Sequence, residues 1–345
     1  MITIAKSSTT EREVLFGNAA EKANIRNPAI VEKDFWVCFT LDYLFHKSPW
    51  PKSFVFKGGT SLSKAYHAIE RFSEDIDLIM DWRLLGYGVH EPWEERSRTQ
   101  QDKFHKKVVA DASEFLTRTL VPQMGRDLSD MIGRIVTVRM DPNDKDQCTV
   151  NFFYPHVFNT DYLRQEIRLE IGPLAEWVPS HPVAITSTLA EQFPGIIQQP
   201  ETIVPTVDAE RTFWEKVTIL HKTAASYKQK GIPSRYARHY YDLYQMGHSE
   251  VKERAFARKE LLEQDVRFKL KFYYARNASY ETAQIGTVRL VPSDAAIKDL
   301  SIDYDHMKDM IYGKKPSFDK IMESIATLEA EINRLLTWQI NIAFL

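Results

Sequence analysis

The stretch that decides the fold runs from residue 53 to residue 80 and reads SFVFKGGTSLSKAYHAIERFSEDIDLIM. It begins with a short β-branched and aromatic run, passes through a Gly-Gly turn into a helical segment, and ends in a second run of strand character. The segment therefore predicts a strand, a glycine turn, a helix and a second strand. The residues expected to carry out the chemistry lie within this strand–turn–helix–strand segment.

Asp75 and Asp77 lie two residues apart in the second predicted strand. Side chains alternate along a strand, so both carboxylates are expected on one face, opposite Ile76, Leu78 and Met80. Two fixed carboxylates suit one or two Mg²⁺ ions, which prefer oxygen ligands and complete their shell with water and substrate phosphates. A solvent-facing strand edge also carries alternating acids, so the pair alone does not predict a metal site.

The glycine turn lies just upstream of these carboxylates. Gly58 and Gly59 end the first strand, and Thr60 and Ser61 open the helix. Glycine permits close backbone approach to a phosphate, and a helix N-terminus offers N–H groups and a positive dipole end. An anion site is therefore expected here. A Walker A loop is excluded because its lysine follows a glycine, whereas Lys64 follows a serine.

A third carboxylate is predicted on the strand-like run QEIRLEIG, residues 165–172. Glu170 shares a strand face with Glu166 and Arg168, and it can hold a catalytic metal or accept the proton of an attacking hydroxyl. Glu166 is equally well placed for this role. A salt-bridged solvent face is the alternative for both glutamates.

The remaining segments predict a sheet with added helices. A core helix, a helical insertion, three further strands and a helical region after Pro200 are expected from periodicity and turn residues. These segments are residues 27–46, 82–126, 133–140, 148–155, 165–172 and 201–345.

Composition limits the classes of protein. The net charge of −2 gives no global positive field for nucleic acid or an anionic membrane. Cys38 and Cys148 are far apart, which argues against a disulfide framework and a structural zinc. The N-terminus lacks the apolar core of a signal peptide, so a cytoplasmic location without membrane contact is expected.

The helices after Asp208 carry the strongest local basic cluster, interleaved with tyrosines. Such a cluster can bind polyphosphate or single-stranded RNA, although a solvated face or pairing with Glu215 and Asp242 is the alternative. Its members are Lys216, His221, Lys222, Lys228, Lys230, Arg235, Arg238 and His239.

The segment FKGGTSLSKAYHAIERFSEDIDL strongly resembles the signature of the AbiEii/AbiGii family of nucleotidyltransferase toxins. VEKDFWVCFTLDYLF upstream and DAERTFWEKVTILH with RYARHYYDLY downstream resemble the family in the same order, so the likeness spans Val31 to Leu243. It implies an α+β fold similar to the DNA polymerase β-like nucleotidyltransferases. Residues 1–200 would form that domain, with mixed sheet, flanking helices and the insertion, and residues 201–345 a mainly helical domain.

The resemblance also implies the site residues. Lys216 falls at the family's phosphate-binding lysine and Asp242 at the acidic residue that closes the active site, so the helical domain would contribute both. The superfamily often has Asp where this chain has Glu170. The implied catalytic residues are Asp75, Asp77, Glu170, Lys216 and Asp242, the metal ligands are Asp75, Asp77 and Glu170, and the nucleotide-binding residues are Lys57, Gly58, Gly59, Thr60, Ser61, Lys64 and Arg238.

The implied activity is transfer of a nucleoside monophosphate from an NTP to an acceptor hydroxyl, on a tRNA 3′ end or a protein, with Mg²⁺ or Mn²⁺. Family members belong to type IV toxin–antitoxin and abortive-infection systems, which act in antiviral defence, and an AbiEi-like antitoxin encoded nearby is the expected partner. Two alternatives stay open: a non-catalytic nucleotide- or RNA-binding module of the same fold, and a metal-dependent phosphohydrolase or nuclease.

Overall fold

The computed structural model describes residues 1–160, 163–174, 179–230 and 232–335, without the side chains of residues 226–230 and 276. It divides into two compact units. The first holds Met1–Ala65 and Ser73–Val207, and the second holds Tyr66–Phe72 and the chain from Asp208 onward.

The first unit is built on a mixed seven-stranded sheet with the order β3-β4-β5-β2-β1-β7-β6. β2 runs parallel to β5 and β1 runs parallel to β7, whereas the other neighbours are antiparallel. The sheet with its many helices confirms the predicted α+β class. The strands are β1 Phe54–Lys57, β2 Asp75–Met80, β3 Thr137–Met140, β4 Thr149–Phe153, β5 Ile167–Gly172, β6 Ser180–Thr186 and β7 Glu201–Val207.

β6 and β7 are strands that the sequence did not predict as such. Proline cannot donate a ladder hydrogen bond and usually argues against a strand, which hides both segments from sequence patterns. In the structure Pro182 of β6 lies opposite Pro205 of β7. β6 is the last strand of the sheet, where a missing donor is tolerated.

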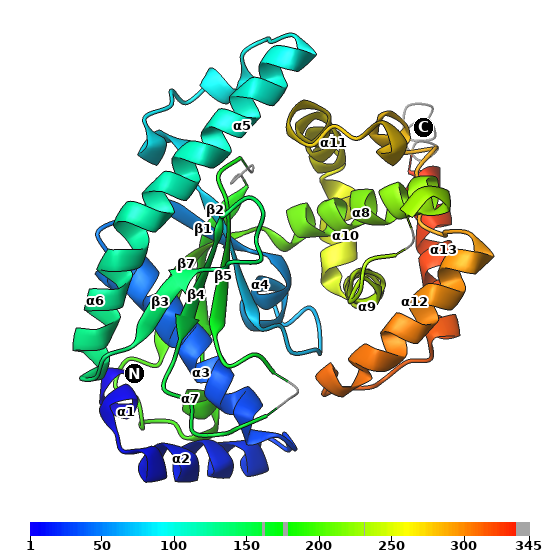
Figure 1. Ribbon diagram of the computed structural model, residues 1–345. Coiled ribbons are helices and arrows are strands. Elements are labelled where there is room, and N and C mark those ends of the chain that lie inside the picture. The colour runs from blue at the N-terminus through cyan, green and yellow to red at the C-terminus, as the bar shows by residue number, and fades with distance from the viewer. Residues whose placement is uncertain (161–162, 175–178, 231, 336–345) are drawn as a thin grey trace. The chain divides into compact units, whose positions relative to one another are not determined.

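The predicted core helix is α3, which covers one face of the sheet (Figure 1). Asn27 accepts a hydrogen bond from the backbone N–H of Ala29, and Pro28 occupies the first turn, as expected of a helix start. Trp36 packs edge-on against Phe152 of β4 at 6.0 Å between ring centroids. The helices of this unit are α1 Ile2–Lys6, α2 Thr9–Lys22, α3 Pro28–Asp42, α4 Gly58–Lys64, α5 Arg98–Phe115, α6 Val121–Ile132 and α7 Thr188–Gln192, with short turns η1 Tyr43–Lys47, η2 Trp82–Leu85, η3 Glu91–Trp93 and η4 Leu116–Leu120.

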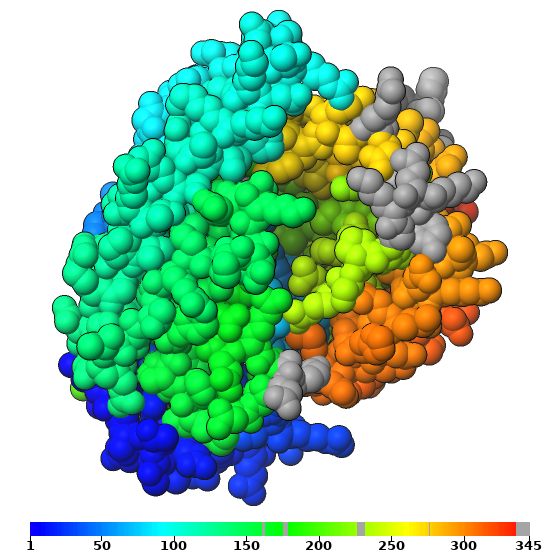
Figure 2. Space-filling model, viewed as in Figure 1, coloured from blue at the N-terminus to red at the C-terminus, as the bar shows by residue number. Residues whose placement is uncertain are grey.

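The expected insertion between two strands is present and extends as far as Ile132. α5 and α6 are joined by the π-helical turn η4 and form one nearly continuous rod in Figure 1, and α6 packs against β3. Figure 2 shows this rod, in cyan and teal, as exposed surface beside the green surface of residues near 150.

The second unit is helical, as predicted for the C-terminal region. α8 begins directly after Asp208, whose carbonyl accepts from the backbone N–H of Thr212. In this unit the short segment Tyr66–Phe72 is tied to the C-terminal chain, because the backbone N–H of Phe72 donates to the carbonyl of Met310. No described helix combines the length and the apolar character needed to cross a bilayer. The helices are α8 Ala209–Lys230, α9 Ala237–Gly247, α10 Glu250–Ala257, α11 Glu260–Phe272, α12 Asp294–Met307 and α13 Phe318–Arg334, with turns η5 Arg276–Ala278, η6 Tyr280–Thr282 and η7 Lys308–Met310.

Candidate active site

Gly58 forms the junction between β1 and α4, with a positive φ of 81° that favours glycine. A Cβ atom added to Gly58 would lie 1.9 Å from Oδ2 of Asp77. Non-bonded atoms cannot approach so closely, so glycine is what allows the turn to lie against this carboxylate. The structure thus brings together two features that the sequence showed separately: the glycine turn and the Asp-x-Asp strand.

Lys57, Asp77 and Glu170 lie side by side on β1, β2 and β5. The register pairs Lys57 with Asp77, and Asp77 with Glu170. Directly paired residues share a sheet face with their Cβ atoms about 5 Å apart. Asp75 lies two residues before Asp77 on β2, on the same face, and is paired with Arg168 of β5. The sheet therefore presents three of the predicted carboxylates together on one face.

Arg168 is a cation shared by Asp75, Glu170 and Asp141. Its Nε lies 3.6 Å from Oδ1 of Asp75, its Nη2 lies 3.2 Å from Oε1 of Glu170, and its Nη1 donates to Oδ2 of Asp141. The sequence placed Arg168 on the acidic face without a role and did not single out Asp141. The available signal was an arginine between two glutamates on a strand face expected to be negative.

Asp75 is a buried carboxylate with other carboxylates close to it. Burial raises its pKa, and the charges of Glu170 and Glu74 raise it further, while Arg168 and Lys33 oppose this effect. A carboxylate that is short of positive charge gains from a bound cation. Asp75 is therefore suited to bind one.

Thr60 and Ser61 use their hydroxyl groups within the turn. The hydroxyl of Thr60 donates to the carbonyl oxygen of Asp75 at 2.5 Å, and that of Ser61 donates to the carbonyl of Gly58 at 2.8 Å. Both side chains are buried. They brace the glycine turn against β2, which leaves the backbone of Gly58 and Gly59 as the part of the turn suited to an anion.

Lys64 ends α4 and is engaged by acidic partners. Its Nζ lies 2.9 Å from Oδ1 of Asp34 and 3.9 Å from Oε1 of Glu191. Burial alone would lower the pKa of Lys64, but the charges of Asp34, Cys38 and Glu191, with the hydrogen bond to Asp34, together outweigh it and raise that pKa. Lys64 is thus an ion-pair partner of α3, and its role as a nucleotide ligand stays a prediction.

The chemistry of these donors fits a hard divalent cation. Among the described residues, no group of three or more His, Cys, Asp or Glu side chains is arranged to hold a metal. Mg²⁺ is commonly bound through one or two carboxylates, with water and substrate phosphates in the remaining positions. The oxygens of Asp75 and Asp77 meet that requirement. Glu170, held by Arg168, stays a prediction as a metal ligand.

The second unit holds a buried charge cluster around Asp242. Arg71 binds this carboxylate with two hydrogen bonds, from Nε to Oδ1 at 2.6 Å and from Nη2 to Oδ2 at 2.8 Å. Nζ of Lys216 donates to the same Oδ2 at 2.8 Å. The sequence predicted Lys216 and Asp242 but missed Arg71, whose partner is 171 positions away in the chain.

This cluster carries excess positive charge. Burial alone would raise the pKa of Asp242, but Arg71 and Lys216 hold it well below its usual range. Burial lowers the pKa of Lys216, and Arg71 and Arg238 lower it further, while the charge of Asp242 and its hydrogen bond oppose this effect. His239 lies in the same field, where burial, Lys216 and Arg238 hold its pKa well below the usual value. The cluster suits an anion more than a cation.

The wider basic cluster expected from the sequence is divided in the structure. His221 lies with Nε2 3.0 Å from the carbonyl of Ser279 and accepts at Nδ1 from the backbone N–H of Arg289, so it braces the fold. The side chains of Lys228 and Lys230 lie outside the described residues. Lys216, Arg238 and His239 are the members that lie around Asp242.

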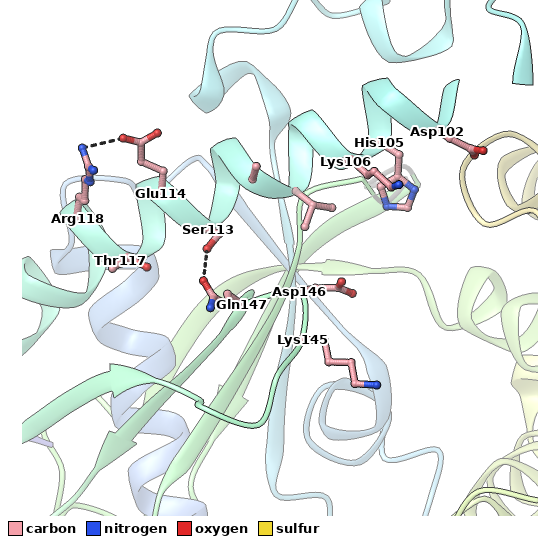
Figure 3. A pocket seen from close by; sticks show the side chains of 12 residues that line it. Asp102, His105, Lys106, Ser113, Glu114, Thr117, Arg118, Lys145, Asp146 and Gln147 are labelled. Carbon is pink, nitrogen blue, oxygen red and sulfur yellow. Dashed lines mark hydrogen bonds and ion pairs between the residues drawn. The ribbon is translucent and has the colours of Figure 1, made fainter. Parts of the chain in front are cut away.

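A groove of about 810 Å³ lies elsewhere in the first unit, between α5 and the loop after β3 (Figure 3). Its walls carry charges of both signs, and some of these are paired with each other, as in Arg118 and Glu114 at 2.9 Å. Ser113 donates to Gln147 across it at 3.3 Å. None of the predicted site residues lines this groove, so the candidate active site remains the carboxylate face.

Residues 42–324 match a family model described as nucleotidyl transferase AbiEii toxin, type IV toxin–antitoxin system. Among solved structures, the chain is similar to MenT4, a nucleotidyltransferase toxin from Mycobacterium tuberculosis H37Rv, at 15% identity and a TM-score of 0.39. That alignment covers 93% of this chain and 98% of MenT4. Comparison with curated proteins finds no match.

Proposed function

The chain belongs to the AbiEii family of nucleotidyltransferase toxins of type IV toxin–antitoxin systems, and we propose that it transfers a nucleoside monophosphate from an NTP to an acceptor hydroxyl. The observation that carries the proposal is the contact between Gly58 and Asp77, where no Cβ fits. A phosphate held by the turn would lie beside a cation held by Asp75 and Asp77. A nucleoside triphosphate with its bound metal requires a phosphate site and a cation site side by side in this way.

In the proposed reaction, an oxygen of the acceptor hydroxyl forms a new bond to the α-phosphorus of the NTP. The bond from that phosphorus to the oxygen bridging to the β-phosphate breaks, and pyrophosphate leaves. Glu170, about two-fifths exposed, accepts the hydroxyl proton. Bound Mg²⁺, or Mn²⁺ in its place, supplies Lewis-acid stabilisation of negative charge.

Lys216 is proposed to offset charge on the triphosphate. An ammonium has three N–H bonds, and the described contact with Asp242 uses one of them. Arg71 keeps Asp242 in place by two further hydrogen bonds, so Lys216 can add a phosphate partner without leaving its carboxylate.

The acceptor is proposed to be the 3′ end of tRNA or a protein hydroxyl, and the toxic effect is proposed to be neutralised by an AbiEi-like antitoxin encoded nearby. Incubation of the purified protein with each α-labelled NTP, total tRNA or cell protein, and Mg²⁺ or Mn²⁺ tests this. We expect label on one acceptor class, matched by pyrophosphate release and abolished by EDTA.

Two results would contradict the proposal. Shortened tRNA without label would indicate a phosphohydrolase or nuclease. Metal-dependent NTP binding without pyrophosphate release, with every acceptor offered, would indicate a binding module. Growth of cells expressing the chain with and without the neighbouring antitoxin gene tests neutralisation separately.

A further inference from the structure

Three consecutive charged residues of α3 are buried: Glu32, Lys33 and Asp34 are only 1%, 1% and 6% exposed. The rest of this helix is almost wholly apolar and packs against the sheet. Removing a charge from water is unfavourable unless hydrogen bonds and an opposite charge compensate for it. Each of the three side chains therefore needs a specific partner.

Lys33 has two partners, which lie at the start of two different strands. Its Nζ donates to Oε2 of Glu74 at 2.7 Å and to the carbonyl oxygen of Arg164 at 2.7 Å. Glu74 immediately precedes β2, which begins at Asp75, and Arg164 lies three residues before β5. One ammonium thus joins the chain segments that lead into the parallel strands carrying the site carboxylates.

Asp34 holds the other part of the site. Its Oδ1 pairs with Nζ of Lys64 at 2.9 Å, at the end of the helix that starts with the glycine turn. Its Oδ2 accepts from the backbone N–H of Thr188 at 2.6 Å. Glu32 accepts from the backbone N–H groups of Val157 and Phe158 and so anchors a loop of the sheet.

We propose that Lys33 is a positioning residue of the active site, with Asp34 as its counterpart. Lys33 fixes the segments that lead into β2, which carries Asp75, and into β5, which carries Glu170, while Asp34 fixes the helix that starts with the glycine turn. The inference rests on the proposed function, because it assigns these residues to the same metal and nucleotide site.

The hydrogen bonds of Lys33 and Asp34 have fixed directions, which ordinary apolar core packing lacks. A well-packed apolar pair often stabilises a fold as well as a buried ion pair does, but it lacks the fixed donor and acceptor directions of a hydrogen bond. Sites that bind metal need their ligands held within roughly 0.5 Å.

The test replaces the buried pair without leaving an unpaired charge. In Lys33→Met with Glu74→Met, both charges are removed and the volume is kept. Binding of Mn²⁺ alone, measured by electron paramagnetic resonance, and kcat and KM for the NTP are the readouts. Loss of a residue that orients metal ligands typically weakens metal binding or activity by about 10–100-fold. We expect a folded protein with Mn²⁺ affinity and kcat reduced to that extent, and a smaller change in KM.

A milder variant, Lys33→Arg, keeps the charge beside Glu74 but changes the donor geometry, and we expect an intermediate loss of Mn²⁺ affinity. The matched control is Lys269→Met, which removes another buried ammonium, one paired with Asp265 at 3.1 Å. It should lower the melting temperature and leave Mn²⁺ affinity unchanged.

The outcomes separate this inference from the proposed function. Parental Mn²⁺ affinity and kcat in both Lys33 variants would overturn the positioning role, as would an equal loss of Mn²⁺ affinity in Lys269→Met. If the parent transfers no nucleotide to any acceptor, yet Mn²⁺ affinity falls in the Lys33 variants alone, the proposed reaction is wrong and the positioning role stands.

Discussion

Asp75 in the first unit and Asp242 in the second have opposite electrostatic surroundings. On the sheet, Asp75 shares a single arginine with Glu170 and Asp141, and its pKa is raised by burial and by neighbouring carboxylates. In the helical unit, Asp242 has two cations to itself and its pKa is held low. A carboxylate short of positive charge is suited to receive a cation, whereas a saturated one is suited to hold its cations in place.

The largest expected effect is on stability, at Asp242. Asp242→Ala leaves Arg71 and Lys216 buried without their shared carboxylate, and breaking a buried ion pair in this way costs about 3–5 kcal/mol. Urea denaturation measures the loss. Asp309→Ala is the control, because Asp309 is mostly exposed and its pair with Lys315 is worth less than about 1 kcal/mol. Equal losses in the two variants would contradict the structural role of Asp242.

Asp77 should show the reverse pattern, with a large effect on activity and little on stability. Removing a principal electrostatic contact raises an activation barrier by about 3 kcal/mol, or roughly a hundredfold in rate. Asp77→Ala is therefore expected to abolish most label transfer and the toxicity, with a melting temperature close to the parent's. Glu114→Gln, at an exposed pair, should transfer label normally. Parental transfer by Asp77→Ala would rule out the metal-site assignment.

Gly58→Ala tests the contact between turn and strand. The positive φ costs about 1–2 kcal/mol for alanine, and the added Cβ must also displace the carboxylate of Asp77. Gly86 is a matched control, since it has a φ of 88° but no heavy atom within 4 Å of an added Cβ. Both variants should lose similar backbone stability, while the transfer rate should fall about tenfold or more in Gly58→Ala alone. A similar fall in Gly86→Ala would show that strain, not contact, is responsible.

The smallest expected effect is a pH dependence of opposite sign at the two carboxylates. A folded-state pKa below the unfolded value of about 3.9 means that Asp242 stabilises above that pH and that this contribution is lost on acidification. For Asp75 the folded pKa is raised, so its contribution is greatest below the unfolded pKa and is lost as pH rises through the folded one.

Asp75→Asn should therefore increase stability at neutral pH in the presence of EDTA, and the gain should vanish in acid. Urea denaturation of parent and variant between pH 4 and pH 8 measures this. If Asp75→Asn is less stable than the parent, and by the same amount at pH 7 and at pH 4, then the carboxylate of Asp75 does not destabilise the folded protein at neutral pH.

Part of the site was predictable because its residues are close in sequence. Alternation places Asp75 and Asp77 on one face, and the glycine turn lies within the same segment, so both follow from local geometry. Arg168 and Arg71 were not predictable as partners, because Asp141 and Asp242 lie 27 and 171 positions from them. Nothing in a single sequence specifies which distant charges will meet.

Lys33 and Asp34 show the same limit for the fold. A helix with buried apolar spacing was predicted from the sequence, but no role was predicted for the charged residues within it. Their partners Glu74 and Lys64 become evident only when α3 packs on the sheet.

The sequence by itself determined the α+β class, the Asp-x-Asp strand, the glycine turn and the helical C-terminal region, because these depend on side-chain alternation, backbone freedom and helical spacing within short segments. The tertiary structure decided which carboxylates share Arg168, that no Cβ fits between Gly58 and Asp77, and that Asp242 is saturated by Arg71 and Lys216. The reason is physical: strand register and helix packing set the distances between charges, and those distances, more than residue type, determine whether a carboxylate receives a cation or anchors one.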